Sequence, residues 1–154
     1  MKAESSKPEE ATRRLTDRAA IQDVLLRYAR GVDRRDLDLV AACFTPDASY
    51  ESALASGTIA DALARLRDRM ARYEATMHFI GNQLVEISGD TASSETYAVA
   101  YHRLTDAGIP TLFSVGVRYL DELVRSGECW RIRHRVVKTE WQRTEMLEGG
   151  SRDG

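Results

Sequence analysis

Three histidines, His78, His102 and His134, are the side chains best suited to acid–base chemistry near neutral pH. They show neither HxH nor HExxH spacing, and the sequence contains no GxSxG element, no phosphate-binding glycine loop and no dinucleotide fingerprint. The two cysteines, Cys43 and Cys129, are too few for a four-thiolate zinc site. The residue types therefore predict chemistry without a metal or a cofactor, carried by histidine, carboxylate, tyrosine and arginine.

His78 lies in the segment MHFIGN, where strand alternation places His78 and Ile80 on one face and Met77 and Phe79 on the other. A histidine within a strand is commonly a structural residue with satisfied hydrogen bonds, and that interpretation stays open here. Because imidazole titrates near neutral pH, His78 is nevertheless the best candidate general base in the chain.

Tyr28 and Asp33 lie near the apolar stripe at the end of a predicted helix. A carboxylate beside a buried face needs a partner, because an unpaired buried charge is costly. The alternative is that Asp33 only ends the helix, or faces water beside Arg34 and Arg35. The residues alone leave both interpretations open.

Further candidates lie in the predicted strands. Arg135 belongs to the segment CWRIRHRVV, whose alternation does not tell which face meets the core. Tyr50 stands alone in a short strand and is either a core residue or part of a pocket. Tyr97 and Tyr101 share one strand face and are predicted to line a pocket, whereas His102 then points the other way and is the weaker catalytic candidate.

The elements that must position these side chains follow from periodicity. Apolar residues at three- and four-residue steps from Ala20 to Val32 predict an amphipathic helix that begins at Thr16. A short helix follows Asp36, and a third is expected over 59–73. Period-two patterns and turn residues then predict strands over these ranges: 48–52, 77–88, 91–104, 111–123 and 129–141. We expect one domain over 16–142, with flexible tails over 1–15 and 143–154.

The predicted third helix carries an arginine run opposite its apolar positions, on a face with Arg65, Arg67, Asp68, Arg69 and Arg72. Such a run is typical of a solvated helix face, and we interpret it so rather than as an anion site.

Helices followed by strands joined only by turns indicate an α+β fold, with N-terminal helices on a curved, mostly antiparallel sheet that encloses a small-molecule pocket. The chain of 154 residues is 43% hydrophobic and 30% charged, with a formal net charge of −2. It has no basic excess for nucleic acid, no apolar run long enough for a membrane span and no secretory leader, so the cytoplasm is the expected compartment. The outer sheet face, with Val115, Val117, Tyr119 or their neighbours, should be covered in a homodimer or homotrimer.

Three segments carry a resemblance to a known family: the opening LTDRAAIQDVLLRYARGVDRRDLDLVAACFTPDASY, then MHFIGNQLVEI, then WRIRHRVVKTEW. Over about residues 14–142 the sequence resembles the SnoaL-like branch of the nuclear transport factor 2-like superfamily. This branch includes hexachlorocyclohexane dehydrochlorinase, bile-acid dehydratase and, more distantly, scytalone dehydratase. The resemblance implies a cone-shaped α+β barrel with an Asp–His dyad in a closed pocket.

Carried over residue by residue, the resemblance places the dyad on Asp33 and His78, pocket residues on Tyr28 and Tyr50, and the strand arginine on Arg135. Tyr28 stands where the dehydrochlorinase has a lysine and is more similar to the bile-acid dehydratase. The second histidine of scytalone dehydratase has no certain match, since His102 is only near the right place.

The resemblance implies a cofactor-independent lyase, a dehydratase or dehydrohalogenase, acting on a small apolar substrate such as a steroid, terpenoid, polyketide or halogenated compound. His78 would remove a proton from carbon, and Arg135 with Tyr28 or Tyr50 would stabilise negative charge. The superfamily also holds isomerases, polyketide cyclases and non-catalytic assembly subunits. These remain the alternatives, because fold membership does not fix function.

Overall fold

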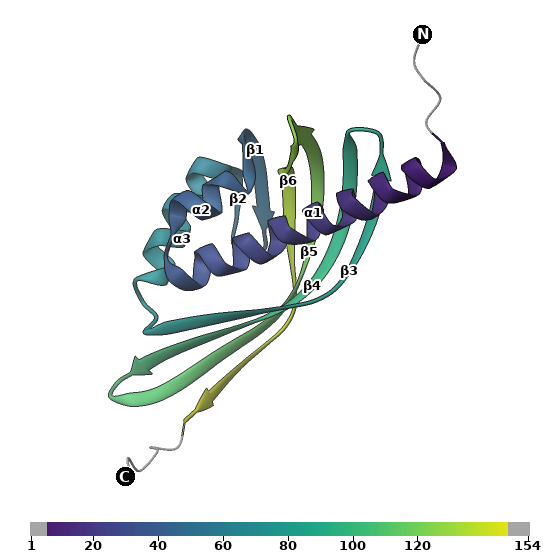
Figure 1. Ribbon diagram of the computed structural model, residues 1–154. Helices are drawn as coiled ribbons and strands as arrows, with labels where there is room; N and C mark the ends of the chain where they lie inside the picture. Colours follow the sequence, from purple (N-terminus) through teal and green to yellow (C-terminus); the bar gives the residue numbers. More distant parts are fainter. Residues whose placement is uncertain (1–5, 148–154) are drawn as a thin grey trace.

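The computed structural model describes residues 6–147, which form three helices on one face of a bent six-stranded sheet (Figure 1). The elements are α1 (Lys7–Arg34), α2 (Leu37–Ala42), β1 (Phe44–Ser52), β2 (Ala55–Thr58), α3 (Ile59–Met70), β3 (Ala75–Ser88), β4 (Thr91–Asp106), β5 (Ile109–Ser126) and β6 (Cys129–Met146). The strand order is β2-β1-β6-β5-β4-β3. The described part of the molecule therefore has the predicted α+β fold with a mostly antiparallel sheet.

Helix α1 is longer than the sequence pattern predicts, because it begins at Lys7 rather than at Thr16. The Glu9 carboxylate accepts a hydrogen bond from the Ser6 backbone N–H at 2.8 Å, which satisfies one free donor at the helix start. Pro8 is tolerated in the first turn, and the segment EEATRRL consists mainly of good helix formers. The part of the expected N-terminal tail from Lys7 onward is therefore helical, and residues 1–5 lie outside the described residues.

A buried carboxylate on α1 ties this helix to the far strands. Asp17 accepts hydrogen bonds from Trp130 Nε1 at 3.0 Å and from Arg125 at 2.8 Å. The hydrogen bond from Arg125 is the largest influence on the pKa of Asp17 and holds it below its ordinary value. Asp17 thus orients α1 across the sheet, which brings the C-terminal end of the helix over β3.

The turn between α1 and α2 is close-packed. A Cβ atom at Gly31 would lie 2.8 Å from Val40 Cγ2, so only glycine allows this approach of the two helices. Arg35 adopts the left-handed conformation and ends α1 directly after Asp33 and Arg34. The end of α1 is therefore fixed in place at the position of the candidate carboxylate.

Two features of the sheet are absent from the sequence expectations. Strand β2 pairs antiparallel with β1, and β1 pairs in parallel with β6, which places Tyr50 beside Arg135. The last strand also continues to Met146, so residues 143–146 are paired with β5 rather than forming a tail. The rest of the expected C-terminal tail, 148–154, lies outside the described residues.

The expectation that Val115, Val117 and Tyr119 lie on the outer face of the sheet is wrong. Val115, Val117 and Tyr119 face the helices rather than the outside, since Tyr119 is 4% exposed and all three line the interior cavity. Their outward neighbours include Gly116 and Arg118. Alternation fixes which residues share a face but not which face is inside. The observed orientation buries the face with the larger apolar side chains.

No helix of residues 6–147 is both long enough and apolar enough to span a membrane.

Candidate functional site

A cavity of about 150 Å³ lies between the helices and the inner face of the sheet. Its walls come from α1, β1, α3 and the strands β3 to β6, and include Tyr28, Tyr50, His78, His102 and Tyr119. A second cavity of about 290 Å³ adjoins it beneath α3. The two share the side chains of Tyr28, Tyr50, Ser52, Leu54, Leu66 and Arg69.

Asp33 and His78 are brought together at the wall of the smaller cavity. His78 Nδ1 lies 2.7 Å from Asp33 Oδ1, and the His78 backbone N–H donates to Asp33 Oδ2 at 2.8 Å. The Thr76 hydroxyl donates to Asp33 Oδ1 at 2.9 Å. The His78 side chain is only 7% exposed. The end of α1 and the start of β3 thus position one carboxylate against one imidazole.

The hydrogen bonds define the charge of Asp33 and the tautomer of His78. Burial would raise the pKa of Asp33, but the hydrogen bonds from the His78 ring and backbone and from Thr76 outweigh burial and hold that pKa below its ordinary value. An ionised carboxylate only accepts hydrogen bonds, so Nδ1 of His78 must donate. In the neutral ring Nε2 is then left as a proton acceptor, and His78 lines the cavity.

His102 also faces the cavity, contrary to its low ranking in the sequence analysis. Its ring lies 6.1 Å from the His78 ring in an edge-on arrangement, and its Nδ1 donates to the Phe113 carbonyl at 3.2 Å. Burial lowers the pKa of His102 to about 4, and the hydrogen bond to Phe113 only partly opposes this. His102 is thus a neutral polar group beside the dyad. His102 pairs with Thr76, directly opposite on β3, and so lies on the same sheet face as His78. Alternation within one strand could not show this, because it does not tell which strands are paired or in which register.

The lowered pKa of His102 predicts a specific acid sensitivity. Between pH 6.5 and about 4 the unfolded chain binds a proton at this residue that the folded protein does not. The free energy of unfolding should therefore fall by about 3 kcal/mol as the pH is lowered through this window. His102→Asn, which keeps a donor for the Phe113 carbonyl, should remove that slope. Urea unfolding of both proteins from pH 7 to pH 4 measures it, and equal slopes would contradict the assignment.

Tyr28 and Tyr50, predicted as pocket residues, both line the two cavities. Burial raises the pKa of Tyr50, so its hydroxyl remains protonated and able to donate a hydrogen bond. Tyr28 lies in edge-on contact with the rings of Phe44 and Tyr119, at centroid distances of 6.0 and 5.7 Å. The structure therefore brings both tyrosines to the same space as His78.

Arg135 lies behind the cavity wall rather than on it. The side chain is fully buried and forms two 2.7 Å hydrogen bonds with Asp121, which is itself buried. Its guanidinium carbon lies 4.3 Å from the ring centroids of both Tyr28 and Tyr119. Burial opposes its charge, but Asp121 outweighs this and raises the pKa of Arg135. Arg135 thus supports two cavity tyrosines and does not itself reach the cavity.

Tyr97 and Tyr101 require a correction, because they lie on the outer face of the sheet. The register pairs His78 with Ala100 and Thr76 with His102, which turns the two tyrosines of β4 away from His78. Tyr97 is 39% exposed and borders an outer groove with Phe79 and Trp141. Aromatic character suggested a pocket for these residues, but the phase of the strand decides against it.

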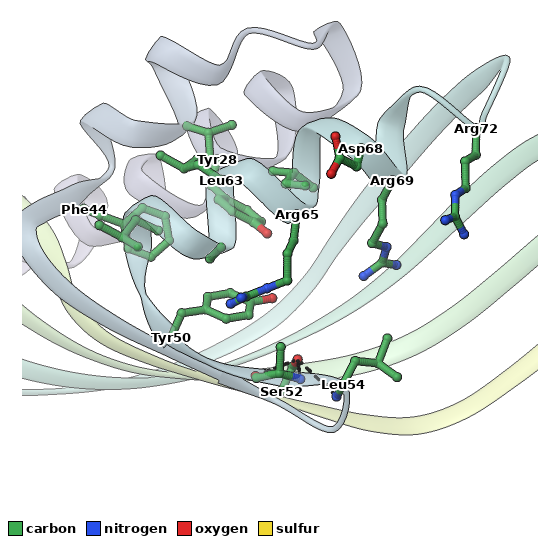
Figure 2. A pocket seen from close by; sticks show the side chains of 15 residues that line it. Tyr28, Phe44, Tyr50, Ser52, Leu54, Leu63, Arg65, Asp68, Arg69 and Arg72 are labelled. Carbon is green, nitrogen blue, oxygen red and sulfur yellow. Dashed lines mark hydrogen bonds between the residues drawn. The ribbon is translucent and has the colours of Figure 1, made fainter.

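The arginine run of α3 is only partly a solvated face. Arg65, Asp68, Arg69 and Arg72 line the larger cavity, and Figure 2 shows the Arg65 side chain beside Tyr50, with Arg69 and Arg72 further along. Arg67 does not line it. The spacing of four residues places Arg65 and Arg69 on one face of α3, and Arg72 follows just after the helix, which ends at Met70 rather than at residue 73.

The comparisons with known proteins agree with this architecture. The chain is 32% identical over 127 residues to an uncharacterized protein of Mycobacterium tuberculosis, covering 79% of this chain and 84% of that protein. The crystal structure of a Kribbella flavida protein matches with a TM-score of 0.75 and 26% identity, covering 83% of this chain and 93% of that one. A hexachlorocyclohexane dehydrochlorinase from Novosphingobium barchaimii matches with a TM-score of 0.74 and 21% identity over 88% of this chain and 93% of that one.

The family model for the SnoaL-like domain matches residues 13–136, which include most of α1, Asp33, His78 and the first part of β6 with Arg135. That range is most of the chain, and the curvature, strand order and helix placement agree with it. The chain therefore belongs to the SnoaL-like domain family of the nuclear transport factor 2-like superfamily.

Proposed function

We propose that this protein is a cofactor-independent lyase, a dehydratase or dehydrohalogenase, in which His78 removes a proton from a carbon atom of the substrate. The observation that carries the proposal is the 2.7 Å contact between Asp33 and His78 at the wall of an interior cavity. A family that includes lyases and isomerases, and the structural similarity to a dehydrochlorinase, support the same class of reaction.

In the proposed reaction Nε2 of His78 accepts the proton from carbon. The electron pair of the broken C–H bond forms the new double bond, and a hydroxide or halide leaves from the neighbouring carbon. Asp33 stabilises the imidazolium that forms, and its hydrogen bond holds the ring in place. In the dehydratase case the imidazolium returns its proton to the leaving hydroxide, which departs as water.

Stabilisation of the leaving group falls to the tyrosines. The Tyr50 hydroxyl, kept protonated by burial, can donate a hydrogen bond to negative charge that develops in the cavity. Arg135 acts as a positioning residue, because its guanidinium packs against the rings of Tyr28 and Tyr119 without lining the cavity. This changes the role that the resemblance implied, in which Arg135 itself, with Tyr28 or Tyr50, stabilises negative charge on the substrate or the leaving group.

The walls of both cavities favour a small, mostly apolar substrate with oxygen or halogen substituents. Besides the tyrosines, aliphatic and aromatic side chains dominate the lining, among them Leu66, Phe113 and Val115. Steroids, terpenoids, polyketide intermediates and halogenated hydrocarbons share this character. We propose that the reaction takes place in the cytoplasm and needs neither a metal nor an organic cofactor.

The test of this function is a screen in deuterium oxide with mass spectrometric detection, starting from β-hydroxy ketones and then halogenated hydrocarbons. Loss of water or hydrogen halide identifies a lyase. A product of unchanged skeleton mass that has gained deuterium identifies an isomerase or cyclase that uses the same base, and would replace the lyase proposal. If a substrate binds but neither loses water or hydrogen halide nor gains deuterium, acid–base catalysis is contradicted.

The outer sheet face predicts self-association. Met77, Phe79, Leu84, Tyr97 and Trp141 are each between 39% and 66% exposed there, which is more apolar surface than isolated side chains produce. We propose that a second copy of the chain covers this face in a homodimer or homotrimer. Light scattering at micromolar concentration should give a multiple of 17.3 kDa.

A charged residue within that apolar face should separate the subunits. Phe79→Asp is expected to give the monomer mass, whereas Leu15→Asp, at an exposed apolar residue of α1, should leave the assembly unchanged. A monomeric wild-type protein would contradict the proposal.

A further inference from the structure

Arg65 and Arg69 of α3, and Arg72 just after its end, form a positively charged side of the larger cavity, called the α3 wall below. Figure 2 shows Arg65 beside Tyr50, with Arg69 and Arg72 further along the same side. Asp68 also lines this cavity, so its four charged side chains carry a net charge of +2. Within residues 6–147, none of the three guanidinium groups has a hydrogen bond or an ion pair. Three guanidinium groups held on one side of a cavity repel one another and favour the approach of an anion.

Other arginines of the protein show how different this arrangement is. Arg118 bridges Glu95 and Glu140, Arg125 bridges Asp17 and Asp90, and Arg135 pairs with Asp121. Each of these guanidinium groups is neutralised by carboxylates of the chain itself. The arginines of the α3 wall are left with their donors available, which is the arrangement that binds carboxylates and phosphates.

Apart from its charged side chains, the larger cavity is mostly apolar. Its lining includes Val40, Phe44, Ile59, Leu63 and Leu66, and its volume is about 290 Å³. A cavity with apolar walls and cationic groups along one side complements a ligand with an apolar body and one anionic end. A fully hydrophilic anion would leave the apolar walls without a partner.

Arg69 connects this wall with the reactive site. It lines both cavities together with Tyr50. Burial is the largest influence on both neighbouring groups: it raises the pKa of Tyr50 and lowers the pKa of His102. The positive charge of Arg69 lowers both pKa values. One ligand can therefore contact Arg69 through its anionic end and still extend to His78.

We infer that Arg65, Arg69 and Arg72 form an anion-binding subsite, which takes the carboxylate or phosphate of an apolar substrate whose reacting carbon lies beside His78. The inference rests on the proposed function for the position of the reacting carbon, and it adds a charge requirement to the substrate. Among the candidate substrates it selects those that carry an acidic group.

The test compares ligands of equal shape and different charge. Isothermal titration calorimetry at low ionic strength measures the binding of 2-naphthoate, 2-naphthyl phosphate and the neutral naphthalene-2-carboxamide. The anions should bind about tenfold or more tightly than the carboxamide, and added salt should reduce this advantage. The tighter of the two anions identifies a carboxylate or a phosphate as the preferred group.

Variants on the same helix supply the matched control. Arg69→Gln should weaken the binding of the anions about 3–10-fold and leave the carboxamide unchanged, as expected for one partly exposed charged contact. Arg67→Gln removes the same charge from α3 but lies outside the cavity lining, so it should change none of the affinities. Because all these residues are exposed, thermal unfolding should be the same for each variant.

Two results would overturn the inference: equal affinities for naphthoate and carboxamide, or equal losses in the Arg67 and Arg69 variants. Binding does not require turnover, so His78→Gln should still bind the anions and still show the Arg69 dependence. The subsite and the dyad can therefore fail separately.

Discussion

Replacement of His78 by glutamine should lower kcat by about 10²–10⁴-fold on any substrate from the deuterium oxide screen, because the variant loses the group that accepts the proton. The substrate affinity should change little, since glutamine keeps a polar side chain at the cavity wall. Steady-state kinetics and deuterium exchange at the substrate carbon measure the effect. Circular dichroism confirms that the variant is folded.

His134→Gln is the control for this change. His134 lies on β6, where its Nδ1 is 2.6 Å from the Ser49 hydroxyl, and it lines none of the described cavities. Its replacement should leave kcat unaffected. Asp33→Asn should also lower kcat, because the amide no longer fixes the donating tautomer of His78. A His78→Gln variant within about threefold of the wild type would contradict general-base catalysis by this residue.

Replacement of Arg135 by methionine should destabilise the fold by about 3–5 kcal/mol, since it leaves the Asp121 carboxylate buried and unpaired. The packing between Arg135 and the rings of Tyr28 and Tyr119 is lost at the same time. Urea unfolding at pH 7 measures the change. The double variant Arg135→Met with Asp121→Leu should recover most of it, because no charge then remains buried.

Arg133, two residues earlier on the same strand, is the matched control. It pairs with Glu122 at 2.9 Å, but both side chains are more than half exposed. Arg133→Gln should change the free energy of unfolding by less than about 1 kcal/mol. An Arg135→Met variant no less stable than Arg133→Gln would show that Asp121 does not need its buried partner.

Periodicity was sufficient to predict the long helix, the short one and the four long strands. It could not give the start of α1, because the first turns carry no apolar stripe and depend on capping at Ser6. Strand β2 was missed for a similar reason. Its four residues, ASGT, have no strand pattern, and their pairing with β1 depends on the close return of the chain.

The candidate site was likewise only partly predictable from the sequence. The resemblance named Asp33 and His78, and the structure places them in contact. Alternation put Tyr97 and Tyr101 on one face and His102 on the other, which is correct, but it contains no information on which face is inside. The buried position of Arg135 depends on the inward direction of Asp121 on the neighbouring strand, and strand pairing of this kind is not contained in either segment alone.

The central claim is that Asp33 holds His78 with its Nδ1 donating and its Nε2 free to accept a proton in the cavity. Nitrogen-15 NMR of histidine-labelled protein at alkaline pH tests it without any substrate. We expect a neutral His78 with the proton on Nδ1, and a weaker preference for this tautomer in Asp33→Asn. A neutral His78 with the proton on Nε2, unchanged in Asp33→Asn, would contradict it.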